Sequence, residues 1–377
     1  MNKRVVMTVT NDVVSDPRVE KEATALSGAG WDVTILAWDR QGSADPIVER
    51  DGFRIERLGP RARSGGGLSS LSRFRGFWDN ATARAIELDP AVVHCHDLDT
   101  AVVGMRVKHA LPSASFVLDH HELYRSTRMV PQRGLKGVVA RAVVDALDHR
   151  AARRADLIVI ANPGHAPRYE RLAPGKTITV ENAPELERFH PVAHHDEGPF
   201  TVCYIGQKRY AESLLQLIDM VSRHDDLAAL LAGGGVAEAQ IEAAASGVPR
   251  VRTLGRVLYS QIPELYEGCD AVFVVYDANL DNVRYGLQVK IIEGMACGLP
   301  VIVNAGTYAG DLVERERIGV TVDGADPVAV EAAVLGLKND RAAAREMGAR
   351  GRALVEGGLN WQASVARLVT GYARLAE

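Results

Sequence analysis

Residues 282–304, read as NVRYGLQVKIIEGMACGLPVIVN, carry the strongest structural signal in this chain. A turn at 285–286 contains a glycine, and the segment after it places Lys290 and Glu293 at i and i+3, on one face of a helix. The Gly-Leu-Pro sequence at 298–300 then breaks the helix before an apolar strand. A helix that opens after such a turn directs free N–H groups at phosphate, and a carboxylate one turn further accepts hydroxyl hydrogen bonds. The stretch therefore predicts a strand-end site for a phosphorylated, polyhydroxyl ligand.

Short apolar runs alternate with helical patterns on both sides of this stretch. Strands are predicted at 4–10, 31–38, 91–96, 115–121, 155–162 and 176–182, with helices at 18–26 and 101–108, and further strands at 200–206, 227–233, 251–255, 269–276 and 299–304. This rhythm predicts parallel sheets covered by helices on both faces. We therefore expect an α/β protein with two Rossmann-like domains that face each other across a cleft. The expected ranges are 1–185, a linker at 186–199, and 200–355, followed by a final helical segment at 356–377.

Composition excludes several classes of protein. The 377 residues include 47% hydrophobic and 24% charged residues with a formal net charge of -4, so nothing favours a nucleic acid partner. No apolar run approaches about 20 residues and the N-terminus lacks a signal peptide pattern, so we expect a cytoplasmic protein. The four cysteines lie far apart without a CxxC pair, which predicts free buried thiols. They are Cys95, Cys203, Cys269 and Cys297.

Polar residues follow the predicted strands of the first half. Asp16 suits a helix N-cap and is followed by a proline, so both a plain cap and a substrate contact stay open for this loop. His94 and His96 point to the same face of their strand, and Asp97 and Asp99 form an Asp-x-Asp sequence. Such a sequence alone is a weak metal signal, so we favour structural or acceptor-side roles and expect no metal.

The run at 119–122, Asp-His-His-Glu, leaves the next strand. An imidazole that titrates near neutrality can donate to or accept from a sugar hydroxyl or a phosphate. The alternative for the histidine pair is a helix cap or a core contact.

The sequence from 285 to 303 resembles the donor-site signature of retaining, nucleotide-sugar-dependent glycosyltransferases with the GT-B fold, the large bacterial group 1 or family four type. That signature has a Glu, seven residues and a second Glu, then a helix of small residues and a Gly-x-Pro-Val strand. Glu293 matches the second Glu, and residues 295–301 match the tail. Tyr285 stands in place of the first Glu, as in a variant of the family in which a Tyr and a Lys precede the Glu. The resemblance thus implies that Lys290 shares in donor recognition.

Three more segments extend the resemblance. Residues 119–122 are similar to the family's DxHE element, which implies that His121 bonds the transferred sugar with Glu122 beside it. Residues 15–23, SDPRVEKEA, resemble a subset of the family in which Arg18 corresponds to a substrate contact. The run 254–265 resembles the base-binding loop, where backbone groups of two residues read the nucleobase; here these are Arg256 and Val257.

The diphosphate-binding pair departs from the family pattern. Relatives carry an Arg and a Lys where Gln207 and Glu212 stand here. A departing diphosphate needs cationic or N–H donors, so we expect one or more of Lys208, Arg209 and Lys290 to contact phosphate.

The predicted site has three parts. Catalytic roles are assigned to His121, Glu122 and Lys290. Donor binding is assigned to Gly206, Gln207, Lys208, Arg209, Gly233, Arg256, Val257, Tyr285, Gly286, Leu287, Gln288, Val289 and Glu293. The acceptor side is assigned to Asp16, Arg18, His96 and Asp97, and no residue is assigned to a metal.

The resemblance implies a metal-independent, retaining hexosyltransferase. It needs no cofactor, because a UDP- or GDP-type sugar is its donor substrate, and its acceptor is a sugar, glycan, natural product or lipid-linked molecule. It also implies that the final helix packs on the first domain. Two alternatives remain open: a GT-B epimerase or pseudo-glycosyltransferase, and an inactive nucleotide-binding homologue.

Residues 60–80 interrupt the βαβ rhythm. They combine four arginines with Leu68, Leu71, Phe74, Phe77 and Trp78 after a Gly/Ser-rich start. One interpretation is a cationic amphipathic surface for a lipid-linked acceptor or for a membrane, whose inner face it would contact peripherally. We favour the other, a loop leading into a helix whose apolar residues belong to the core.

Overall fold

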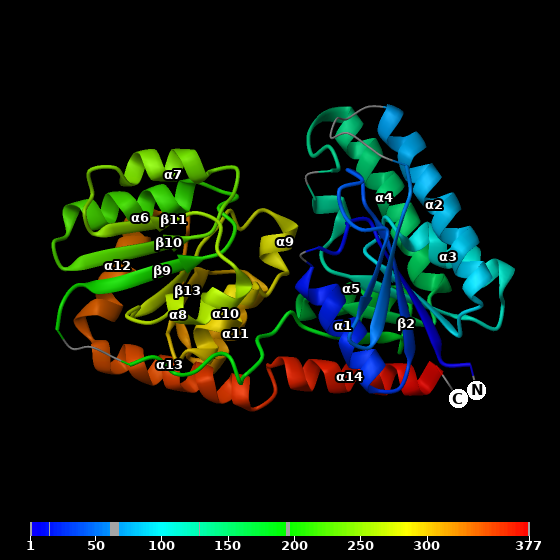
Figure 1. Ribbon diagram of the computed structural model, residues 1–377. Helices are drawn as coiled ribbons and strands as arrows, with labels where there is room; N and C mark the ends of the chain where they lie inside the picture. Colours follow the sequence, from blue (N-terminus) through cyan, green and yellow to red (C-terminus); the bar gives the residue numbers. More distant parts are fainter. Residues whose placement is uncertain (1, 15, 61–67, 128, 194–196, 376–377) are drawn as a thin grey trace. The chain divides into compact units, whose positions relative to one another are not determined.

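The computed structural model describes residues 2–14, 16–60, 68–127, 129–193 and 197–375. The chain divides into two compact units, residues 1–181 with 364–377 and residues 182–363 (Figure 1). The segment 186–199, expected to be a linker, thus falls within the second unit, and its Phe189 is buried in that unit's core. The predicted α/β class with two Rossmann-like domains is confirmed.

An eight-stranded sheet forms the first unit, in the order β3-β4-β2-β1-β5-β6-β7-β8. Its neighbours are parallel, except that β3 and β4 form an antiparallel pair at the edge. The strands are β1 (Arg4–Val9), β2 (Asp32–Trp38), β3 (Ile47–Arg50), β4 (Phe53–Leu58), β5 (Val92–His96), β6 (Ser115–His120), β7 (Leu157–Ile160) and β8 (Thr177–Thr179). The helices are α1 (Pro17–Gly28), α2 (Leu68–Leu88), α3 (Ala101–Ala110), α4 (Gly134–Arg154), α5 (Ala166–Leu172) and, from residue 364 onward, α14 (Trp361–Leu375).

Helix α2 contains the second part of the irregular segment 60–80. Trp38 stacks on Phe77 with ring centroids 5.3 Å apart, and Phe74 meets the same indole edge-on at 5.0 Å. The core interpretation is therefore correct for these aromatic side chains. Residues 61–67 and the side chains of Leu68 and Leu71 lie outside the described part of the structure.

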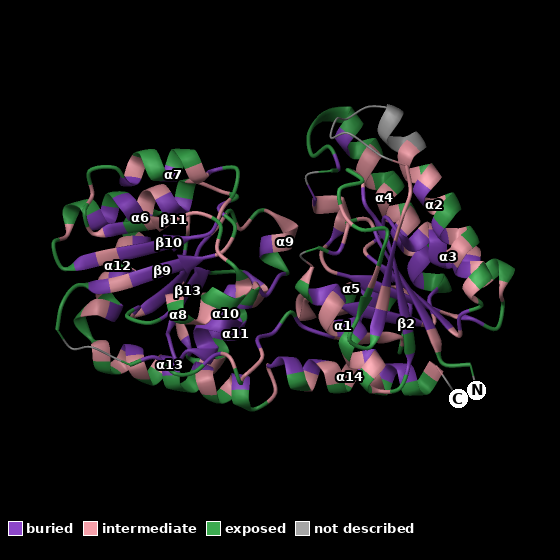
Figure 2. Cartoon of the chain, in the orientation of Figure 1, coloured by how far each residue is buried: buried purple, intermediate pink, exposed green. Residues whose placement is uncertain are grey.

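A six-stranded parallel sheet forms the second unit, in the order β11-β10-β9-β12-β13-β14. Its strands are β9 (Phe200–Ile205), β10 (Leu227–Ala232), β11 (Val251–Leu254), β12 (Ala271–Val274), β13 (Val301–Asn304) and β14 (Gly319–Val322). Its helices are α6 (Glu212–Arg223), α7 (Glu238–Ala245), α8 (Ile262–Leu265), α9 (Asp281–Arg284), α10 (Val289–Ala296), α11 (Tyr308–Glu316), α12 (Pro327–Asn339) and α13 (Arg341–Glu356). The inner strands β9, β10, β12 and β13 are almost entirely buried, whereas the edge strands β11 and β14 are partly exposed (Figure 2).

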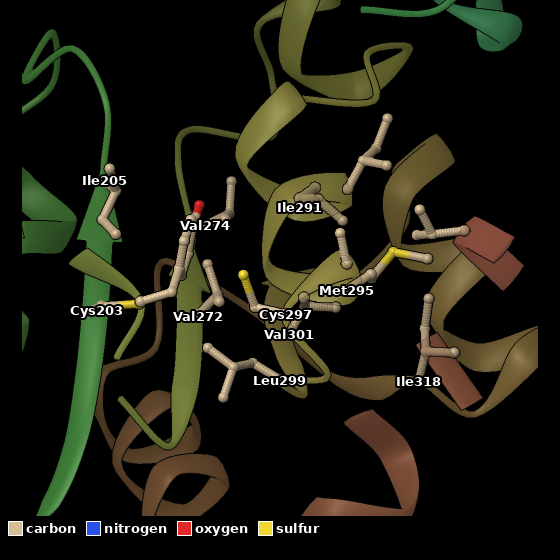
Figure 3. Close-up of a cluster of buried hydrophobic side chains, with 14 of the residues drawn as sticks. Cys203, Ile205, Val272, Val274, Ile291, Met295, Cys297, Leu299, Val301 and Ile318 are labelled. Carbon is tan, nitrogen blue, oxygen red and sulfur yellow. The ribbon is translucent and has the colours of Figure 1, made fainter. Parts of the chain in front are cut away.

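Helix α10 is anchored by the core beneath it. Ile291 and Met295 pack with the side chains of β9, β12 and β13 in one buried cluster (Figure 3). Gly298 has φ +75°, a conformation that ends a helix at low cost, and β13 follows. This packing buries α10 from Lys290 to Ala296. All four cysteines are free and buried, as predicted.

Within the described ranges, no helix combines the length and apolar character that crossing a membrane requires.

Candidate active site

Each sheet has a point at which the strand order reverses. In the first unit this point lies between β1 and β5, and in the second between β9 and β12. Open α/β sheets bind ligands outside the carboxyl ends of the strands at such a point. The polar side chains gathered at these two places are therefore the candidates for a site in each unit.

Lys290 reaches the switch point of the second unit. Its Nζ donates hydrogen bonds to Tyr276 Oη at 2.6 Å and Tyr204 Oη at 3.2 Å, and it lies 4.3 Å from the centre of the Tyr204 ring. Tyr204 belongs to β9 and Tyr276 follows β12, so the ammonium group sits where the strand order reverses. Lys290 is only 8% exposed, which rules out a solvated helix face as its environment.

Two glycines make room for this ammonium group. Gly206, directly after β9, has φ +151°, and a Cβ there would lie 2.7 Å from Lys290 Nζ. Gly233, directly after β10, has φ +118°, and a Cβ there would lie 2.2 Å from the Gly206 carbonyl oxygen. Only glycine fits at these two positions, so the two loops can approach each other closely because both residues lack a side chain.

Glu293 lies one turn further along α10 and is 2% exposed. Its Oε2 accepts a hydrogen bond from Tyr266 Oη at 3.2 Å. Burial, with the charge of Glu293, raises the pKa of the Tyr266 phenol, so this hydroxyl stays a donor. The carboxylate is thus fixed by the protein instead of pointing freely to solvent.

The predicted set of diphosphate contacts needs one correction. Lys208 is buried and its Nζ donates to the Leu254 carbonyl at 2.7 Å, so it serves the protein interior. Arg209 and Gln207 are exposed, and Arg209 Nε donates to Gln207 Oε1 at 2.8 Å. Lys208 could not be excluded from sequence, because its burial follows from the loop at 233–235, which closes over it.

The start of the helix also differs from the prediction. Helix α10 begins at Val289, not directly after Gly286, and Gln288 precedes it without a side-chain cap. Gly286 is buried together with Leu287, whereas Tyr285 is 40% exposed. Beyond β11, Arg256 is exposed and Val257 half-buried.

The predicted acceptor-side residues make contacts within the first unit. Asp16 caps α1 by accepting from Val19 N, as the sequence suggested. Arg18 is 6% exposed and pairs with both carboxylate oxygens of Asp119, at 2.7 and 3.1 Å. The guanidinium of Arg18 is thus held by Asp119 and by the Val180 carbonyl, and a substrate contact for Arg18 stays a prediction.

His121 lies between two carboxylates. Its Nε2 is 3.2 Å from Asp119 Oδ2 and its Nδ1 is 3.4 Å from Asp97 Oδ2. Burial alone would lower the pKa of His121, but the two carboxylates outweigh burial and raise it to about 10. The expectation of an imidazole titrating near neutrality is wrong: at neutral pH the ring is an imidazolium, which can only donate.

The side chain of Asp97 also binds the backbone N–H of His121. Asp97 has φ +61°, and its Oδ1 accepts from His121 N at 3.1 Å. Burial raises the pKa of Asp97 to about 7. Asp97 is therefore a positioning residue for His121. His96 is 1% exposed, and its Nδ1 lies 3.1 Å from Asp119 Oδ2.

A buried group that sequence reasoning missed surrounds Arg18. Glu22, His94, His96 and Asp119 each offer a ligand atom, all within 4.8 Å of one another. Arg18 already pairs with Asp119 and lies 3.0 Å from Glu22 Oε1. Its guanidinium therefore supplies the positive charge that a divalent ion would otherwise bring to these carboxylates. The group fits a buried ion-pair network better than a metal site. Its signal in the sequence was the i, i+4 spacing of Arg18 and Glu22 after the first strand.

Comparison with known proteins shows the family to which the chain belongs. Residues 15–183 match the family model described as glycosyl transferase 4-like domain, and residues 199–340 match the one described as glycosyl transferases group 1. The chain belongs to the group 1 glycosyltransferases, which have the GT-B fold.

A GDP-mannose-dependent monoacylated alpha-(1-6)-phosphatidylinositol monomannoside mannosyltransferase from Corynebacterium glutamicum is 25% identical over 214 residues. The match takes in 52% of this chain and 56% of that relative, so the chain spans about half the relative's length.

Solved structures share the fold across the whole chain. A sucrose-phosphate synthase from Thermosynechococcus elongatus has a TM-score of 0.81 at 20% identity, covering 99% of both chains. Anabaena HepE in complex with UDP has a TM-score of 0.69 at 13% identity, again over 99% of both. A UDP-forming trehalose-phosphate synthase from Burkholderia xenovorans has a TM-score of 0.72 at 11% identity, over 100% of both. At these identities the likeness establishes the fold alone.

Proposed function

We propose that this chain transfers a hexosyl group from a UDP- or GDP-type nucleoside-diphosphate sugar to a hydroxyl of a second molecule, with retention of configuration and without a metal ion. One observation carries the proposal: a buried lysine ammonium group stands at the strand switch point of the second unit, under a glycine loop. A cation and close backbone approach are what a diphosphate requires there.

The donor would lie over the start of α10. Lys290, the first N–H groups of α10 and Arg209 would neutralise the diphosphate, in place of the basic pair that Gln207 and Glu212 replace. Glu293 would accept the ribose hydroxyls while Tyr266 holds its other oxygen. The backbone of Arg256 and Val257 would read the base.

His121 is the proposed contact for the transferred sugar, as the family resemblance implies. A histidine kept as an imidazolium presents a fixed positive charge, which stabilises the negative charge that develops as the donor bond breaks. Asp97 and Asp119 would position the ring, and Glu122 follows it in the sequence at the same strand end.

The reaction balances without a protein nucleophile. The bond from the anomeric carbon to the diphosphate oxygen breaks, and the acceptor oxygen bonds to that carbon from the same face. The acceptor proton passes to the departing diphosphate. The Corynebacterium relative is named for a lipid acceptor, and we propose an acceptor hydroxyl on a sugar, glycan or lipid-linked molecule.

Incubation with UDP-, GDP- and dTDP-sugars tests this proposal without knowledge of the acceptor. We expect slow release of free sugar and nucleoside diphosphate from one of the donors, and loss of that release in Lys290→Ala. An isomerised donor would identify an epimerase instead, and binding without any turnover, even with added acceptor mixtures, would identify a nucleotide-binding homologue.

A further inference from the structure

Helix α4 carries an exposed apolar stripe. Leu135 is 81% exposed and Val143 is 64% exposed. They belong to a series at i, i+3, i+4, i+7, i+8 and i+11, the spacing of one helix face. Its members, all exposed, are Leu135, Val138, Val139, Ala142, Val143 and Ala146. Contiguous exposed apolar side chains of this kind mark an interaction surface.

The opposite face of α4 explains why these residues stay outside. Its buried positions are Gly137, Asp148, Ala151 and Ala152, and Val144 and Leu147 pack half-buried against the core beside them. Asp148 accepts from Arg168 at 2.7 Å, which holds this polar side toward the protein. The inner face of α4 thus packs on the core as in an ordinary surface helix, and the exposed stripe is a second apolar face on the same helix.

The charges that remain on the outside of α4 are all positive. Lys136, Arg150 and Arg153 are exposed, and the last two lie 15 and 18 residues after Leu135, close to whole numbers of turns. They therefore continue the face that carries the apolar stripe. The two acidic residues of α4 are paired with arginines: Asp145 with Arg125 and Arg168, and Asp148 with Arg168. This local excess contrasts with a net charge of -4 for the chain.

We propose that this face of α4, called here the α4 surface and defined by Leu135, Val138, Val139, Val143, Lys136, Arg150 and Arg153, docks on an anionic lipid bilayer. Apolar side chains enter the boundary between headgroups and acyl chains, and flanking basic residues bind anionic headgroups. A second copy of the chain is disfavoured as the occupant, because two such faces would bring their cations together. The proposal concerns binding alone and does not depend on the transfer reaction.

Co-sedimentation with vesicles tests the α4 surface. We expect the full chain to bind phosphatidylglycerol/phosphatidylcholine vesicles at least tenfold more tightly than pure phosphatidylcholine vesicles, and raised salt to weaken that binding. Leu135→Ser combined with Val139→Ser, and separately Arg150→Ser combined with Arg153→Ser, should each lower the affinity at least tenfold. Because these side chains are exposed, the unfolding temperature of each variant should stay at the wild-type value.

Matched controls separate this surface from general stickiness. Val328 is 75% exposed on α12 and Arg252 is exposed on β11, so Val328→Ser and Arg252→Ser should leave vesicle binding unchanged. Equal binding to both kinds of vesicle, or binding that survives both α4 variants, would overturn the proposal. A concentration-dependent dimer in light scattering that is abolished by the Leu135/Val139 double variant would overturn it too, in favour of a second copy.

Discussion

His121 shows how an environment can reverse the role that a residue type suggests. From sequence alone, a histidine at a strand end is expected to exchange protons near neutral pH. The carboxylates of Asp97 and Asp119 instead raise the pKa of His121 and keep its ring protonated. The sequence could place His121 at the site, since it follows a buried strand. It could not reveal the charge, because Asp97 is 24 residues away and meets His121 only after a turn with φ +61°.

His121→Ala should cut transfer by about 100-fold, since a fixed charge near the breaking bond is lost. The affinity for nucleoside diphosphate should hardly change, because that ligand is proposed to bind the second unit. Steady-state kinetics and calorimetry measure the two effects, with His109→Ala, an exposed histidine of α3, as the control. A tenfold loss of nucleotide affinity, about 1.4 kcal/mol, would show that His121 is misplaced.

The same residue predicts how stability depends on pH. The folded pKa of His121 is raised from 6.5 to about 10, so its stabilisation is present below 6.5 and lost as pH rises through 10. Burial raises the pKa of Glu22 to about 8, which acts in the same direction between its ordinary 4.5 and 8. We expect the unfolding temperature to fall from pH 7 to 10, and His121→Gln to flatten the part above pH 8. An identical pH profile in this variant would contradict the ion-pair network.

Gly206, in the loop after β9, leaves the space that the ammonium group of Lys290 on α10 occupies. Gly206→Ala would place a Cβ 2.7 Å from Lys290 Nζ and strain a φ of +151°, so it should weaken diphosphate binding more than nucleoside binding. Gly247→Ala is the matched control: its φ is +90°, yet nothing lies within 4 Å of the added Cβ. Both variants should lose stability on the order of 1–3 kcal/mol from backbone strain. Equal nucleotide affinities in the two would remove Lys290 from the phosphate site.

Elements with a clear pattern of apolar residues were predictable from the sequence, and elements without such a pattern were not. The buried parallel strands read as continuous apolar runs, for example Val5 to Val9 in β1. Strand β3 was missed because Ile47–Arg50 is an exposed edge with no apolar run. Helix α4 was missed because apolar side chains lie both on its exposed stripe and on its inner face, so no single apolar face marks the helix in the sequence.

In the proposed mechanism, two kinds of positive group neutralise the leaving diphosphate in place of a metal ion. They are side chains at the strand switch points and N–H groups at helix starts. Transfer activity should therefore survive EDTA, as a radiochemical or coupled assay with and without chelator would measure. Complete loss, restored by magnesium or manganese, would contradict this. It would direct attention back to the Asp97-Leu98-Asp99 sequence and to the buried group of Glu22, His94, His96 and Asp119.

Calorimetric titration of nucleoside, monophosphate and diphosphate, in both the uridine and guanosine series, tests the donor site on α10 most directly. Lys290→Ala should lose diphosphate affinity by about 1.5–3 kcal/mol and spare the nucleoside, whereas Glu293→Ala should weaken all three ligands by about that amount. Lys338→Ala on α12, which removes an ion pair with Asp226, should change none of them. Unchanged affinities in both α10 variants would contradict the assignment of a nucleotide-sugar site to this chain.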